Sequence, residues 1–209
     1  MAYSRGTSTN IIVGAAAFFM ADTTLVPTVT PSFVGSASYR ETLSSNANYD
    51  NVGYTTNGLE MQFQPDFGEV QVDQILDVAK LYKQGMQVSV ATAFAEATLE
   101  NLLLALAGNN DDLTGTKSSS TGRILNLSAG DIGECPVERG IVAVGPGTGD
   151  CDDSAAVERV YIGYRALSIE NVTVSAKRDE ASMFEVSFRL LPNDDASYGK
   201  IVDRSLTAS

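Results

Sequence analysis

The sequence predicts a β-rich α+β fold: an antiparallel β-sandwich or partial barrel with one packed α-helix. Several short segments alternate apolar and polar residues with a period of two, which is typical of strands with one buried face. The 18 glycines and many Ser, Thr, Asn and Asp residues supply turns between such strands. Only one segment has the apolar spacing of an amphipathic helix.

Composition indicates one folded domain that spans residues 1–209. Hydrophobic residues make up 44% of the chain and charged residues 19%, and this length is enough to bury a core. No apolar run approaches the roughly 20 residues that cross a bilayer. The formal net charge of −12 argues against a nucleic-acid binder, which needs clustered Lys and Arg. It does not exclude DNA that passes without binding.

The first apolar segment covers residues 11–20 and is either a buried strand or the core of a signal peptide. Only Arg5 is charged before it, and no small-x-small cleavage site follows before Asp22, so we expect a strand. Residues 22–50 form a long connection with one extended piece around 32–43. We expect this connection and residues 1–10 to reach a neighbouring subunit.

The next segments predict a hairpin and further strands. Residues 53–56 and 59–63 flank the turn pair Asn57-Gly58, and a second extended run covers 69–74. A break at Gly85 precedes a strand at 86–90. Residues 172–177 and 184–190 also alternate, and 157–165 form a further strand. Residues 141–144 are an apolar interruption of a glycine-rich stretch.

The helix begins at the predicted N-cap Thr92 and ends at Gly108. Its predicted core stripe consists of Phe94, Leu99, Leu102, Leu103 and Leu106. Leu104 lies off this stripe, so it is either covered by a second contact or simply exposed.

Two glycine-rich loops, 108–122 and 129–155, lie within a loop-rich elaboration at about 108–160. It contains Cys135 and Cys151. Free thiols, an intrachain disulfide and an intersubunit disulfide stay open for this pair. The acidic run 150–153 is a solvated loop or a cation site without EF-hand spacing. The glycine run 145–149 lacks the lysine of a phosphate loop, so we expect a surface turn.

The chain contains no histidine. This absence removes Ser-His-Asp and Cys-His catalysis, His-bearing metal sites and the commonest general base. We therefore expect no catalytic, cofactor or metal site, and a protein that is not an enzyme.

Three motifs in residues 50–108 carry a family resemblance. They are a GYT-x-x-G hairpin at 53–58, a V-x-V-D-Q strand at 70–74 and the helix AEATLENLL at 95–103. Their order resembles that of the tail tube (major tail) proteins of tailed bacteriophages. Weaker echoes lie at 10–19, 183–191 and 198–203, whereas 108–160 has no counterpart.

The resemblance implies a structural subunit of the virion tail that is assembled in the host cytoplasm. Such proteins form rings, usually hexameric, which stack into a tube that conducts DNA without specific binding or a membrane. Partners would be further copies and the tail sheath, tape measure and tail terminator proteins. The alternative from another class is an acidic adhesion or carbohydrate-binding β-sandwich, although the chain has no Trp.

In this family the hairpins build the inner barrel of the tube. Alternation predicts that Leu59, Met61 and Phe63 face the core, so the polar hairpin residues face either the lumen or the outer solvent. By that resemblance they would line the lumen. The predicted luminal residues are Glu60, Gln62, Gln64, Glu69, Gln71 and Asp73.

Overall fold

The computed structural model describes residues 12–75, 77–115, 122–128, 132–133, 135–148, 157–174, 178–179 and 181–206. Most of its strands join one nine-stranded sheet, antiparallel except for a single parallel pair. Two α-helices accompany the sheet in the described part of the chain. The β-rich α+β class is confirmed, with two short helices where one was expected.

The sheet has the order β3-β1-β8-β9-β10-β5-β4, and β11 pairs with β9 and β2. The helices are α1 (Tyr39–Ser44) and α2 (Leu99–Ala105), followed by the 3-10 turn η2 (Asn110–Asp112). A separate two-stranded sheet contains β6 (Leu113–Thr114) and β7 (Ile124–Leu125). The nine strands of the main sheet are β1 (Ala17–Ala21), β2 (Val34–Gly35), β3 (Tyr49–Asn51), β4 (Thr55–Gln71), β5 (Val78–Phe94), β8 (Arg139–Pro146), β9 (Val157–Ser168), β10 (Phe184–Leu190) and β11 (Gly199–Leu206).

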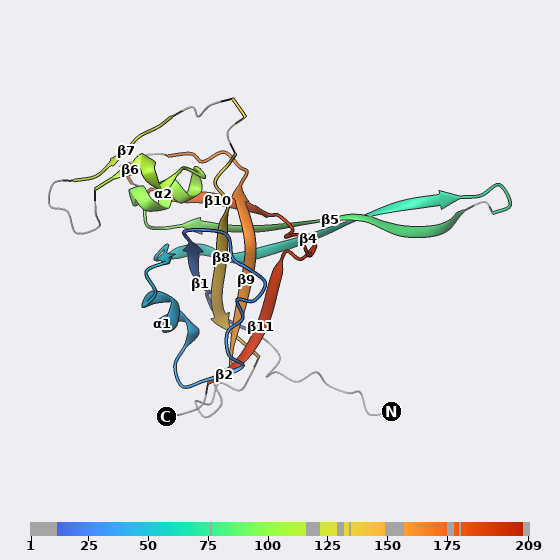
Figure 1. The fold of residues 1–209 in the computed structure, drawn as a ribbon, viewed down its shortest axis with the longest axis horizontal. Helices are drawn as coiled ribbons and strands as arrows, with labels where there is room; N and C mark the ends of the chain where they lie inside the picture. The colour runs from blue at the N-terminus through green and yellow to red at the C-terminus, as the bar shows by residue number, and fades with distance from the viewer. Residues whose placement is uncertain are drawn as a thin grey trace.

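The sheet divides at β9. One edge of this strand pairs with β8 along most of its length. Its other edge pairs with β11 over Val157–Gly163 and then with β10 over Ala166–Ser168. Strands β10, β5 and β4 consequently run across β1, β8 and β9 in Figure 1. The two groups of strands form the layers that enclose the core.

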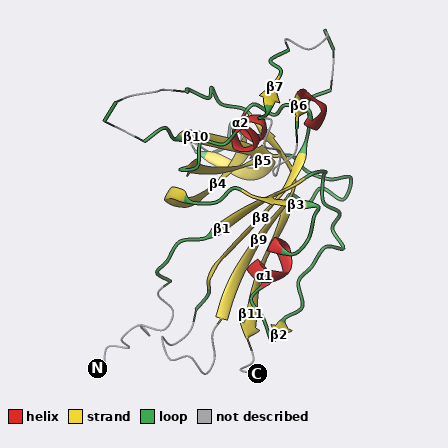
Figure 2. Cartoon of the chain, turned by 90° about the vertical axis from the view of Figure 1, so that its left-hand side faces the viewer, coloured by secondary structure: helices red, strands yellow, loops and turns green. Residues whose placement is uncertain are grey.

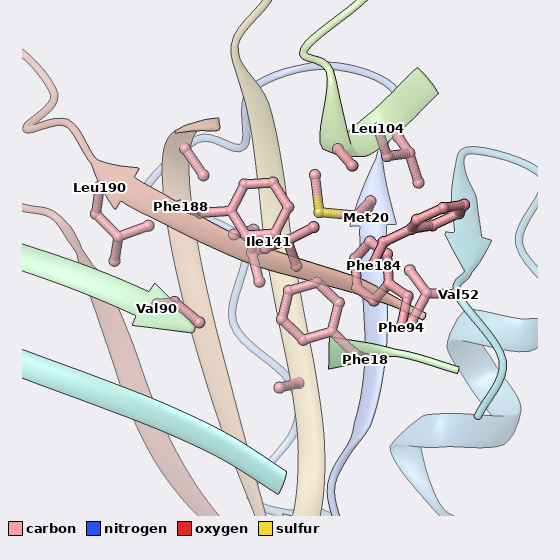
Figure 3. Close-up of a cluster of buried hydrophobic side chains, with 14 of the residues drawn as sticks. Phe18, Met20, Val52, Val90, Phe94, Leu104, Ile141, Phe184, Phe188 and Leu190 are labelled. Carbon is pink, nitrogen blue, oxygen red and sulfur yellow. The ribbon is translucent and has the colours of Figure 1, made fainter. Parts of the chain in front are cut away.

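The main core lies between these layers and is centred on three aromatic rings (Figure 3). Phe18 from β1 lies 5.9 Å from the ring of Phe94 on β5 and 6.1 Å from that of Phe188 on β10. Met20 and Ile141 pack beside them from β1 and β8. This contact between distant strands explains why Phe94 belongs to β5 and not to the helix.

A second cluster covers the opposite face of β1, β8 and β9. Phe19, Val142, Val160 and Tyr164 are fully buried there, and Leu43 of α1 packs on them. Because both faces of β8 are covered, most of its residues are apolar and the strand shows no alternation. Figure 2 shows α1 beside this layer and α2 at the opposite end of the body.

A buried ion pair fastens residues 32–39 to the sheet. Arg204 on β11 contacts Glu158 on β9, and both side chains are less than a tenth exposed. Arg204 also donates hydrogen bonds to the carbonyls of Ser32 and Ala37. Glu158 accepts hydrogen bonds from the Ser38 hydroxyl and the Tyr39 amide. These added hydrogen bonds help to offset the cost of removing the two charges from water.

The N-terminal apolar run forms a buried strand, as expected, but only over Ala17–Ala21. The expected long loop 22–50 contains β2, α1 and the start of β3. The extended piece predicted around 32–43 is confirmed only for β2 (Val34–Gly35), because Ser38 then caps α1 by accepting from the Arg40 amide. Residues 1–10, expected to reach a neighbour, lie outside the described residues.

Two further expectations change. Residues 172–174 have no strand, and 175–177 of that predicted strand lie outside the described residues. The glycine run 145–149 is not a turn at its start, because Gly145 and Pro146 end β8 and pair with β9. The strands expected at 157–165 and 184–190 are confirmed.

Helix α2 is shorter than predicted. Thr98 is its N-cap and accepts from the Asn101 amide, whereas the predicted cap, Thr92, lies in β5. The helix ends in a Schellman motif: Ala107 has a positive φ of 53°, and the Gly108 amide donates to the Leu103 carbonyl.

The predicted stripe is only partly core. Of its helical members, Leu103 is buried and Leu106 is 45% exposed at the C-cap. Leu104, which was predicted to lie off the stripe, is also buried, so it is covered by a second contact. Leu99 and Leu102 are half-buried. No helix in the described ranges has the length and apolarity needed to cross a membrane.

Breaking the buried pair should destabilise the fold strongly. Arg204→Ala leaves the Glu158 carboxylate without its cation. We therefore expect the free energy of unfolding, measured by urea titration, to fall by about 3–5 kcal/mol. Arg159 and Asp203 provide the matched control, since they pair between the same strands but are 25% and 47% exposed. Arg159→Ala should cost less than about 1 kcal/mol. Equal losses would contradict the role of the buried pair.

The helix offers a second stability test. Leu104→Ala should lower the free energy of unfolding by about 2–5 kcal/mol, because a buried side chain leaves a cavity. Leu106→Ala should cost well under 1 kcal/mol because that side chain is largely in solvent. Comparable losses from the two variants, measured by chemical denaturation, would show that the helix packs differently.

Candidate functional site

Strands β4 and β5 form an arm that extends far beyond the body (Figure 1). Each strand has 17 residues, and the two pair from Thr55–Phe94 to Gln71–Val78. The other edge of β5 pairs with β10 only as far as Val88. Beyond that point the arm is a two-stranded ribbon, which in isolation is marginally stable in water.

Irregular pairing occurs at three places along the arm. Asn57 and Gly58, both with positive φ, form a bulge inside β4. They do not form the predicted hairpin turn, because the chain continues in the same direction and the Thr92 hydroxyl donates to the Gly58 carbonyl. Gly85 is likewise no break, since it pairs with Asp66. Further register shifts follow Asp66 and Val70.

One face of the arm is apolar, and we call it the apolar face. Directly opposed residues on paired strands share a face. The pairs on this face are Phe63–Val88, Pro65–Met86, Phe67–Lys83, Glu69–Leu81 and Gln71–Val78. Phe63, Phe67 and Leu81 are 51%, 54% and 60% exposed. Phe63 was expected to face the core with Leu59 and Met61. Leu59 and Met61 do pack on the main core, but Phe63 lies where the ribbon leaves the body.

The opposite face is mostly polar and includes Gln62–Ser89, Gln64–Gln87 and Asp66–Gly85. Of the predicted luminal residues, Glu60, Gln62 and Gln64 lie exposed on this polar face. Glu69 and Gln71 lie on the apolar face, because the same strand continues with no extra residue between Gln64 and Glu69. Asp73 lies in the turn after β4. The six residues therefore do not share one face, which corrects the expectation.

The polar face continues over the body as the outer surface of β4, β5 and β10. Glu60, Glu170 and Glu185 line an open hollow of about 280 Å³ above the small residues Ala91 and Ala93. Alternation in the sequence places Glu185 away from the core. Nothing in the sequence places it near Glu60, because that proximity depends on the pairing of β10 with β5.

A groove of about 330 Å³ lies where the apolar face meets the body. Phe63, Met86 and Val88 line it from the arm, and Tyr198 and Ile201 line it from the body. The Tyr198 hydroxyl donates to the Met86 carbonyl and thereby fastens the root of the arm. Sequence reasoning missed this groove, because its two sides are more than a hundred residues apart.

Two charged residues, both lysines, are part of the groove lining. They are Lys83 and Lys200. The Lys83 ammonium contacts only the thioether of Met86 at 3.5 Å. Lys200 donates to the Pro27 carbonyl and the Thr30 hydroxyl. Neither ammonium has a carboxylate partner within the described ranges.

The predicted loop features are largely outside the described residues. Cys135 is exposed, but Cys151 and the acidic run 150–153 are not described, so the pairing and cation hypotheses remain predictions. In the parts of the chain that are described, no three Cys, Asp or Glu side chains are grouped as metal ligands. Near the elaboration, Arg139 donates to the Gly108 carbonyl and to Asn110, and burial lowers its pKa.

Comparisons with known proteins supply no family. A scan against models of protein families found no match, and a search of curated proteins found none either. The arm, the groove at its root and the carboxylate-bearing sheet face are therefore the features on which a function must be argued.

Proposed function

We propose that the chain is a structural subunit of a bacteriophage tail tube. Copies close into rings, expected to be hexameric, and the rings stack into a tube that conducts DNA in the virion tail. The observation that carries this proposal is the arm. It holds Phe63, Phe67 and Leu81 in solvent, where a monomer gains no stability from them. Exposed contiguous apolar surface of this kind usually marks an interface between proteins.

The open edge of β4 supports self-assembly in a second way. This strand ends the order of the sheet, and in the described part of the chain its outer edge pairs with no strand. An exposed edge of 17 residues is a template for pairing with another chain. A closed ring of copies removes such edges by pairing each with its neighbour.

The polar sheet face is our proposed inner wall. This face carries Glu60, Gln62 and Gln64, together with Glu170 and Glu185. Repeated around a ring, these carboxylates would repel phosphates and keep DNA from adhering, although Arg189 lies on the same face. Glu69 and Gln71 are not part of this wall, because they lie on the apolar face.

Purified protein should form rings or stacked tubes in negative-stain electron microscopy. Phe67→Ser should raise the concentration needed for assembly by several-fold to tenfold, since about 1 kcal/mol of apolar burial is lost at each contact. Tyr82→Ser is the matched control: it is 46% exposed, but on the polar face. Protein that stays monomeric, as an acidic adhesion module would, would contradict the proposal.

The inner wall can be tested through charge. Particles with Glu60→Lys and Glu185→Lys should assemble but eject DNA more slowly, most strongly at low salt, where screening is weak. Glu69→Lys on the apolar face controls for added positive charge and should not slow an assembled tube. Ejection followed by fluorescence of released DNA checks this. Normal ejection by the double variant at low salt would place the carboxylates elsewhere.

A further inference from the structure

The groove at the root of the arm is open, and no segment within the described residues fills it. It is largely apolar, and Lys83 and Lys200 are the two charged residues among those that line it. An occupant that fits would offer exposed apolar side chains with carboxylates beside them. The net charge of the protein is −12, so these two lysines distinguish the groove from its acidic surroundings and favour an occupant with carboxylates.

The tip of the arm has this chemistry. Val72 and Ile75 are 37% and 53% exposed in a turn closed by a hydrogen bond from the Ile75 amide to the Val72 carbonyl. Asp73 lies between them and Asp77 follows. The Asp77 carboxylate accepts only from the Val78 amide among its described contacts. The tip thus combines two apolar side chains with two carboxylates.

The tip cannot enter the groove of its own chain. Nine residues of extended strand separate Phe63 at the groove from Val72 at the tip, which corresponds to roughly 30 Å. The hydrogen-bonded ladder between β4 and β5 holds the ribbon extended over this distance. An occupant with the chemistry of the tip must therefore come from another copy.

We propose that the arm tip of one copy docks into the root groove of another, with Val72 and Ile75 against the apolar lining and Asp73 and Asp77 near Lys83 and Lys200. This rests on the proposed function, which requires copies to associate, and it names the two surfaces that meet. Since tip and groove are different surfaces, the contact is heterologous. A pair of copies keeps one free tip and one free groove, so the contact repeats along a series of copies.

Charge reversal on each side tests the contact. The groove variant carries Lys83→Glu and Lys200→Glu, and the tip variant carries Asp73→Lys and Asp77→Lys. Each alone should raise the concentration needed for assembly at least about tenfold at low salt, because like charges then meet. A variant with all four substitutions should assemble again. Lys80→Glu, on the polar face opposite Val70, is the matched control and should assemble normally.

Mixing the groove and tip variants gives a sharper readout. In the mixture the reversed tip can meet the reversed groove, and the unchanged tip of the groove variant can meet the unchanged groove of the tip variant. Oligomers that neither variant forms alone should therefore appear in mass photometry. Circular dichroism checks the fold of each variant. Because Lys200 and Asp77 make local hydrogen bonds, the single substitutions Lys83→Glu and Asp73→Lys repeat the test without disturbing those bonds.

The outcomes separate the two proposals. Wild-type protein that assembles, together with reversed variants that assemble equally well or a mixture that forms nothing larger than either variant alone, overturns the tip-to-groove contact alone. Wild-type protein that stays monomeric at every concentration overturns the proposed function and the contact together.

Discussion

The fold depends on the need of one strand, β9, for hydrogen-bond partners along both edges. Backbone groups buried in a sheet cannot be left unpaired without a large cost. One edge of β9 is satisfied by β8, and the other by β11 and then β10. Because the second partner changes partway along the strand, the sheet has to turn across itself. That turn brings the Phe18, Phe94 and Phe188 rings together and fixes the direction in which the arm leaves.

The sequence could predict the features that depend on neighbouring residues, but not those that depend on contacts between distant segments. The strands β9 and β10 were predictable because alternation reports a buried face directly. Asn57-Gly58 misled, because two residues with positive φ suit a hairpin turn and a bulge equally well. The predicted helix start at Thr92 was wrong, although threonine has the side-chain oxygen that an N-cap needs. The pairing of Phe94 with Phe184 holds that segment in the sheet.

The candidate site shows the same division. Alternation placed Glu60, Gln62 and Gln64 on one face, but it gave no warning that Glu69 belonged to the same uninterrupted strand. A ribbon with solvent on both sides has little need for a regular apolar pattern, so its length is weakly encoded. Glu185 and the groove beside Tyr198 depend on pairings between distant segments, which a single sequence does not reveal. Local chemistry was visible, whereas its juxtaposition was not.

The distance along the chain between the two sides of the groove bears on the order of folding. The β4–β5 hairpin is local, and hairpins close within about 1–10 μs once their residues are available. Tyr198 lies 112 positions after Met86, and Arg204 reaches back 172 positions to Ser32. Contacts of such range form slowly, and during synthesis they wait for the later residues. A chain emerging from the ribosome thus exposes every residue of the arm before the residues that complete the body have been made.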